Sequence, residues 1–145
     1  MKVLAENRRA RFDYEILETI EAGIELRGFE VKSAKAGRFN IAGSYAIVRG
    51  GEAWLVNSQI PPYQPKNAPP DYDPARTRRQ LLQLKEIKRL VGTLKGKSVS
   101  LVALRAYLKH GFIKIELGVG RSKSKGDKRE VLKKRSAERE MRRMK

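Results

Sequence analysis

The stretch that decides the fold is residues 98–119, which read SVSLVALRAYLKHGFIKIELGV. Apolar side chains recur at alternate positions on both sides of the His110-Gly111 pair, which is the period of half-buried β-strands. In the second run, the residues that share one face are Ile113, Ile115, Leu117 and Val119. Two such runs joined at a glycine predict an antiparallel β-hairpin.

Further strands are predicted upstream of this hairpin. Ser44–Val48 and Ala53–Ile60 flank Arg49-Gly50-Gly51-Glu52, and two glycines between apolar runs predict a second hairpin because a primed turn needs positive φ. Apolar residues alternate again from Tyr14 to Leu26, and the Ala22-Gly23 pair inside that run predicts a bend or bulge.

Two helices are predicted between and after these strands. A short one fits Glu30–Ala36, and a longer one follows the proline-rich loop Pro61–Tyr72, with Asp73 as N-cap and Pro74 as first helical residue. Leucines and isoleucines then recur at helical spacing as far as Leu94, with a break inside this stretch left open. Short strands, glycine-rich turns and few helices predict a mainly β fold: a small antiparallel barrel of the oligonucleotide-binding (OB-like) type with flanking helices.

The composition indicates a polyanionic partner. The chain has 145 residues, about one domain, and 33 Lys and Arg against 16 Asp and Glu give a net charge of +17. RNA, DNA or an anionic membrane surface is the natural complement. The absence of cysteine excludes disulfides and Cys-ligated zinc, and a single histidine gives a metal site little support, so no cofactor is expected. No export signal or bilayer-spanning run stands out, so we expect a soluble, cytoplasmic protein with no membrane partner.

The excess charge divides the chain in two. Residues 121–145 hold 12 Lys and Arg against 4 Asp and Glu, with few large apolar residues, so this segment cannot order itself by burial. We therefore predict an RNA-binding domain over residues 1–120 and a basic tail over residues 121–145 that is disordered when free. Asp127 followed by Glu130 resembles a capping box, which predicts a tail that becomes helical on a polyanion. The alternative is a tail that only solubilises.

Two basic clusters of the body are candidate RNA contacts. The first, residues 7–11, combines an asparagine able to read a base edge with three arginines able to bind phosphates. The second, residues 76–79, lies at the start of the predicted longer helix, where cations oppose the helix dipole and therefore indicate an external anion. For each cluster the alternative is a solvated basic surface.

Several short motifs follow one another along the chain. The first three are Asn7-Arg8-Arg9-Ala10, Glu21-Ala22-Gly23-Ile24 and Gly28-x-Glu30-Val31-Lys32-Ser33. Further on come Asp73-Pro74-x-Arg76-x-Arg78-x-x-Leu81-Leu82, the Val102–Tyr107 strand and Asp127-Lys128-Arg129. In this order and spacing they resemble the SsrA-binding protein family, SmpB, over nearly the whole chain from about Leu4 onward.

The resemblance implies a non-enzymatic protein that binds the tRNA-like domain of transfer-messenger RNA and delivers it to stalled ribosomes for trans-translation. It implies as partners transfer-messenger RNA, the small-subunit RNA of the ribosome and, through the RNA, elongation factor Tu and alanyl-tRNA synthetase. The protein itself is expected to be a monomer. The resemblance and the basic clusters together predict the RNA-binding residues. These are Asn7, Arg8, Arg9, Arg11, Glu21, Lys32, Arg76, Arg78, Arg79, Leu81 and Gln83. The expected ribosome-interacting tail residues are Arg121, Lys123, Lys125, Asp127, Lys128, Arg129, Lys133, Lys134 and Arg135.

The sequence also departs from the family pattern. Gln83 stands where Asn or His is usual, and Arg121-Ser122-Lys123-Ser124 replaces a usual Gly-Lys-Lys run. Gly126 stands where an aromatic residue or His is common, so we expect no stacking contact at that position.

Two other functions compete with this interpretation. A ribosomal or ribosome-assembly protein of similar barrel type would share the charge and the tail. A nuclease or RNA-modifying enzyme would need a carboxylate cluster or a metal site, and the sequence shows no such constellation.

Overall fold

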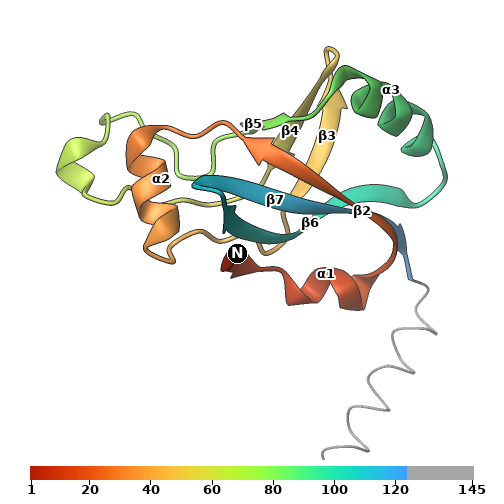
Figure 1. Ribbon diagram of the computed structural model, residues 1–145, viewed down its shortest axis with the longest axis horizontal. Coiled ribbons are helices and arrows are strands. Elements are labelled where there is room, and N and C mark those ends of the chain that lie inside the picture. The colour runs from red at the N-terminus through yellow and green to blue at the C-terminus, as the bar shows by residue number, and fades with distance from the viewer. Residues whose placement is uncertain (124–145) are drawn as a thin grey trace, which may run out of the picture.

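The computed structural model describes residues 1–123, and within them it places seven strands, three α-helices and one short 3-10 helix (Figure 1). The strands are β1 (Lys2–Glu6), β2 (Tyr14–Ile24), β3 (Tyr45–Arg49), β4 (Glu52–Val56), β5 (Arg78–Leu81), β6 (Val99–Lys109) and β7 (Phe112–Ser122). The helices are α1 (Arg8–Asp13), α2 (Gly28–Lys35) and α3 (Leu84–Thr93), with the 3-10 helix at Pro65–Asn67.

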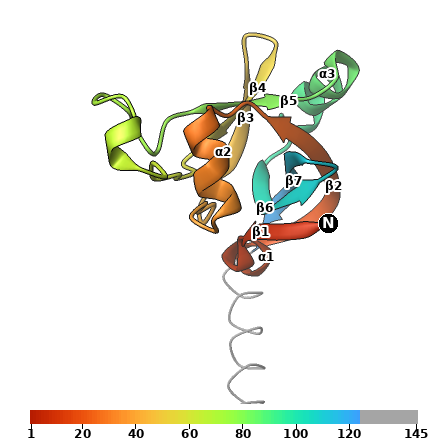
Figure 2. The same ribbon diagram turned by 60° about the vertical axis from the view of Figure 1, so that its left-hand side comes forward.

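The strands form one antiparallel sheet that returns on itself. Neighbouring strands follow the order β1-β6-β3-β4-β5-β2-β7, and β6 also pairs with β7. The pairings therefore make a ring of six strands, with β1 added along β6. In Figure 2, β2, β7, β6 and β1 follow one another around one side of the molecule. The mainly β, antiparallel fold with flanking helices predicted from the sequence is confirmed.

Both predicted hairpins are confirmed, and their turns explain why the sequence specifies them. β3 and β4 pair around Gly50 and Gly51, whose φ angles are 64° and 75°, a combination that glycine adopts without strain. β6 and β7 pair along their whole length around His110 and Gly111, which also have positive φ. Each turn fixes the register of its own hairpin.

The hydrophobic core fills the ring, and a second cluster lies on the outer face of β6. Leu101 and Ala103 belong to the main core, whereas Val102 and Leu104 pack with Ala10 of α1. β6 is thus buried on both faces, which accounts for its nearly unbroken apolar sequence from Leu101 to Leu104.

The predicted short helix is confirmed as α2, but the longer one is wrong at its beginning. Residues 74–83 contain strand β5 rather than helix, and α3 begins only at Leu84. The Asp73 carboxylate does accept a backbone hydrogen bond, from the amide of Ala75 at 2.9 Å, but it closes a turn. Asp73 therefore caps a turn instead of a helix, because Asp side chains stabilise both turns and helix ends.

Three smaller features also differ from the sequence predictions. The irregularity in β2 lies between Ile16 and Glu18, whereas pairing at Ala22 and Gly23 is regular. β4 ends at Val56, four residues early. The short helix α1, which the sequence did not predict, follows Asn7.

The end of the described chain is tied to the body. β7 runs to Ser122, two residues beyond the predicted domain boundary, and the Lys123 amide donates to the carbonyl oxygen of Asp13 at 3.0 Å. The predicted tail beyond Lys123 lies outside the described residues, together with its expected helix.

Candidate nucleic-acid interface

Three of the predicted RNA-binding residues meet in one hollow of the surface. Glu21 comes from β2, Leu81 from the end of β5, and Gln83 from the turn before α3, yet all three line a cavity of about 460 Å³. We call this cavity the Glu21 groove; its lining residues are Thr19, Ile20, Glu21, Leu81, Leu82, Gln83 and Glu86. A neighbouring hollow of about 440 Å³ shares Leu81 and Gln83 and extends the surface to Arg79.

A glycine on the neighbouring strand leaves room for Leu81 in this exposed position. Gly23 and Leu81 are partners across β2 and β5, and a Cβ atom on Gly23 would lie only 3.1 Å from the Leu81 Cβ. Leu81 therefore lies across the backbone of β2 while 47% of its surface remains exposed. Gly23, which the sequence suggested as a bend, instead permits this close approach.

Glu21 presents an ionised carboxylate beside Leu81. The Tyr107 hydroxyl donates to Glu21 Oε2, and Lys109 Nζ lies 3.2 Å from the same oxygen. The hydrogen bond from Tyr107, followed by that from Lys109, holds the pKa of Glu21 below its usual value. The charged form is therefore favoured at neutral pH, and it can accept hydrogen bonds from an exposed base edge. Sequence reasoning missed both partners, which alternate positions on β6 bring to the same place.

Arg78 is not on this surface, which corrects the sequence prediction. Its side chain is fully buried, and its Nε donates to Glu30 Oε2 at 2.9 Å. Its remaining nitrogens donate to Ser58 Oγ at 3.0 Å, the Tyr72 hydroxyl oxygen at 3.0 Å and the Pro74 carbonyl at 2.9 Å. Arg78 therefore fastens the loop between β4 and β5 to α2 and has no free donor to offer an RNA phosphate.

Arg76 shares the same carboxylate. Its Nε donates to Glu30 Oε2 at 3.1 Å, and only 26% of its side chain is exposed. Burial alone would raise the pKa of Glu30, but hydrogen bonds from Arg76, the Arg27 amide, Arg78 and Tyr72 outweigh burial and hold that pKa at about 2. The anion inferred for the second basic cluster is thus Glu30, supplied from within the chain by α2.

Strand alternation explains why Arg78 and Arg79 differ. Adjacent residues of a β-strand point to opposite faces, so Arg78 enters the interior and Arg79 stays outside. Arg79 contacts Glu52 at 2.9 Å and Glu25 at 3.7 Å, and 44% of its side chain is exposed. The helix predicted here would have placed Arg76 and Arg79 on one face, whereas the structure has a strand at Arg78 and Arg79.

The first basic cluster, residues 7–11, also has one buried member and several exposed ones. Asn7 is buried: its Oδ1 accepts from the Ala10 amide at 3.3 Å, and its Nδ2 donates to the Ala103 carbonyl at 2.9 Å. Asn7 thus caps α1 and fastens it to β6, so its amide is occupied within the fold. The three arginines of the cluster remain exposed; they are Arg8, Arg9 and Arg11.

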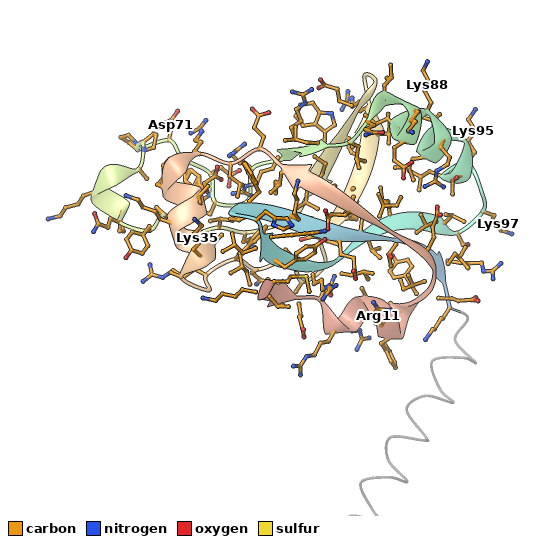
Figure 3. All side chains as sticks on the ribbon, viewed as in Figure 1. Arg11, Lys35, Asp71, Lys88, Lys95 and Lys97 are labelled. Carbon is orange, nitrogen blue, oxygen red and sulfur yellow. The ribbon has the colours of Figure 1, made fainter. Side chains whose placement is uncertain are left out.

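Positive side chains occur on several sides of the molecule. Figure 3 shows Lys88 of α3, and Lys95 just after that helix, at one edge and Arg11 of α1 at the opposite edge. Lys32 is exposed on α2. Of the predicted tail residues, Arg121 contacts Glu15 at 2.9 Å and Lys123 Nζ donates to the Arg11 carbonyl at 3.1 Å.

The other predicted tail positions lie outside the described residues; these are Lys125, Asp127, Lys128, Arg129, Lys133, Lys134 and Arg135.

Residues 1–123 contain neither a group of metal-ligating side chains nor a helix that could cross a membrane. No three His, Cys, Asp or Glu side chains of this part of the chain are grouped closely enough to hold a metal ion. None of its helices is long and apolar enough to cross a membrane.

Comparison with known proteins places this chain in a family. Residues 4–145 match the family model "SmpB protein". An SsrA-binding protein of Gloeothece citriformis is 50% identical over 98% of this chain and 92% of its own length. That of Synechococcus elongatus is 50% identical over 99% of this chain and 93% of its own length. A chain in a solved structure described as "tmRNA-SmpB: a journey to the center of the bacterial ribosome" is 45% identical, with a TM-score of 0.68, covering 88% of this chain and 92% of that one. With a family model spanning nearly all residues and relatives this similar, the chain belongs to the SmpB family of SsrA-binding proteins.

Proposed function

We propose that this protein binds the tRNA-like domain of transfer-messenger RNA through the Glu21 groove and brings that RNA to stalled ribosomes for trans-translation. Membership of the SsrA-binding protein family and the similarity to a tmRNA-SmpB structure support the RNA and the ribosome as partners. The observation that carries the placement is that Glu21, Leu81 and Gln83 line one cavity although they come from distant segments.

The chemistry of the groove suits a folded RNA. Proteins recognise such RNA by its shape, its backbone and a few unpaired bases, which stack on flat or apolar surfaces and offer their edges for hydrogen bonds. Leu81 supplies an exposed apolar contact, the Glu21 carboxylate an acceptor, and Gln83 a side chain with both donors and acceptors. Arg79 stands beside the groove for a backbone phosphate.

The rest of the molecule extends this proposal. The ring of strands acts as a rigid OB-like barrel, Arg8, Arg9, Arg11 and Lys32 add attraction for phosphates, and the basic tail enters the ribosome. The protein acts as a cytoplasmic monomer without catalytic activity. Elongation factor Tu and alanyl-tRNA synthetase act on the bound RNA and meet the protein only through it.

The decisive experiment recovers the RNA bound in cells. The tagged full-length protein is purified from lysate under conditions that dissociate ribosomes, and the bound RNA is sequenced. One dominant transfer-messenger RNA is expected. Recovery of ribosomal RNA alone would favour the competing function, a ribosomal or assembly protein.

The groove itself is tested with two matched leucine variants. Leu81 and Leu17 are exposed to similar extents, 47% and 49%, but only Leu81 lines the groove. Leu81→Ala should weaken binding to the isolated tRNA-like domain roughly tenfold, on the scale of burying one large apolar side chain. Leu17→Ala should bind normally, and equal effects of the two would refute the placement.

A further inference from the structure

One side of α3 carries exposed apolar and basic side chains, and we call it the Lys88 face. Its residues are Leu84, Lys88, Val91 and Lys95. They are four, three and four residues apart, which is the spacing of one side of a helix, and the Leu94 amide still donates to the Leu90 carbonyl where the chain reaches Lys95. Leu84 and Val91 are 61% and 43% exposed. The helix instead buries Ile87 and Leu90, so the Lys88 face is left to solvent.

The two lysines of this face have no counter-charge in the described part of the chain. Within residues 1–123, the salt bridges of α3 are those of Arg89, with Glu18 at 2.7 Å and Glu86 at 3.0 Å. Arg79 of the neighbouring strand β5 is likewise held by Glu52 at 2.9 Å. Carboxylates thus neutralise these arginines locally, whereas the lysines of the Lys88 face direct their charge at solvent, where it attracts a polyanion.

The Lys88 face continues the surface of the Glu21 groove. The hollow of about 440 Å³ beside that groove is lined by Leu81 and Gln83, which also line the groove, and by Leu84 of the Lys88 face. Arg79 and Gly51 belong to the lining of the same hollow. An RNA strand with a base at Leu81 can therefore continue through this hollow and along α3 without leaving the protein surface.

We propose that the Lys88 face binds the sugar–phosphate backbone of the tRNA-like domain next to the nucleotide held in the Glu21 groove, and this proposal rests on the function proposed above. Lys88 and Lys95 are seven residues apart, about 10 Å along a helix, so they contact separate phosphates. Leu84 and Val91 pack against the riboses between them. Phosphate contacts carry no base sequence, so this face positions the RNA while the groove reads it. An acidic protein would also satisfy the lysines, but the shared hollow favours the RNA bound beside it.

Two double variants of the full-length protein test this proposal. The α3 variant combines Lys88→Gln with Lys95→Gln. The control variant combines Lys35→Gln with Lys66→Gln, which removes the same amount of charge from exposed lysines of α2 and the 3-10 helix, on the other side of the molecule from α3 (Figure 1).

Binding to the isolated tRNA-like domain is measured over a range of salt concentrations. Each lost phosphate contact should reduce the magnitude of the slope of log affinity against log salt by about 0.7–0.9. The α3 variant should therefore lose about 1.4–1.8 from this slope, and the control variant much less. Replacing Lys88 and Lys95 by arginine should keep the slope, because the positive charges remain.

Equal slopes for the α3 and control variants would overturn the proposal, because the lysines would then act only through net charge. Normal binding by the α3 variant together with a loss of peptide tagging in a translation extract would assign the face to another partner, such as an acidic protein, and would overturn it as well. Leu81→Ala separates this proposal from the groove, since it should lower the affinity and leave the slope unchanged. If Leu81→Ala binds normally while the α3 variant loses slope, the groove placement is wrong and the α3 contact stands.

Discussion

Replacing Arg78 should lower the stability of the fold rather than simply weaken its hold on RNA. Arg78 and Glu30 are both fully buried, and the guanidinium reaches one carboxylate, two hydroxyl oxygens and backbone carbonyls. Arg78→Met keeps most of the volume but removes every one of these donors. Glu30 then keeps Arg76 and Tyr72 as partners, while Ser58 Oγ loses its donor and the carbonyl of Pro74 keeps only the Ile60 amide.

The size of the effect follows from burial. Removing one partner of a buried ion pair typically costs about 3–5 kcal/mol. Since Arg76 still neutralises Glu30, we expect the lower end, about 3 kcal/mol, which corresponds to a fall of roughly 10 °C in the thermal midpoint for a chain of this size. Arg79→Met is the matched control, because its exposed ion pairs should contribute less than about 1 kcal/mol.

Urea unfolding followed by circular dichroism measures both variants, with the slope of the transition checked for two-state behaviour. The tRNA-like domain is titrated in the same buffer. If Arg78→Met unfolds like the wild-type protein and only its RNA affinity falls, Arg78 faces the RNA and the buried cluster described here is wrong.

Three further predictions follow from the same structure. Acid should destabilise the protein as Glu30 protonates: its pKa of about 2 lies below the ordinary 4.5, so about 3 kcal/mol of stability present above pH 4.5 is lost as the pH falls towards 2. Glu30→Gln should remove that part of the pH dependence in unfolding titrations. Gly23→Ala should displace Leu81, whose Cβ lies 3.1 Å from the added methyl group. It should therefore reduce the free energy of binding to the tRNA-like domain, measured by gel shift, more than the free energy of unfolding, measured by thermal melting. Truncation after Lys123 keeps β7 complete, so the shortened protein should still bind the tRNA-like domain. It should no longer support peptide tagging in a translation extract with a non-stop message. Normal tagging would show that the tail only solubilises the protein.

The strands and turns could be predicted from local patterns because alternation and glycine positions are themselves local. Arg78 could not. Its burial depends on Glu30, which is 48 residues away in the sequence and approaches only when α2 packs against the loop before β5. Asp73 followed by Pro74 is typical of both a turn and a helix start, so the sequence predicted a helix where the structure has β5.

In the candidate site, too, local motifs could be predicted from the sequence, whereas contacts between distant segments could not. The motifs predict Glu21 and Leu81 as RNA contacts, but their common cavity depends on the pairing of Gly23 with Leu81. Tyr107 and Lys109, which hold the Glu21 carboxylate, carry no signal in the sequence because they act through strand register. Asn7 was predicted to read a base edge, but its side-chain amide is hydrogen-bonded to α1 and β6 within the fold.

The most direct test of the central claim is site-specific photocrosslinking to transfer-messenger RNA. A photoreactive phenylalanine analogue is placed at position 81, in the Glu21 groove, or at position 63, which is similarly exposed and lies outside it. Sequencing then maps each crosslink on the full-length RNA. The groove assignment predicts efficient crosslinks from position 81 to unpaired bases of the tRNA-like domain and few from position 63. Crosslinks from position 63 with none from position 81 would contradict it.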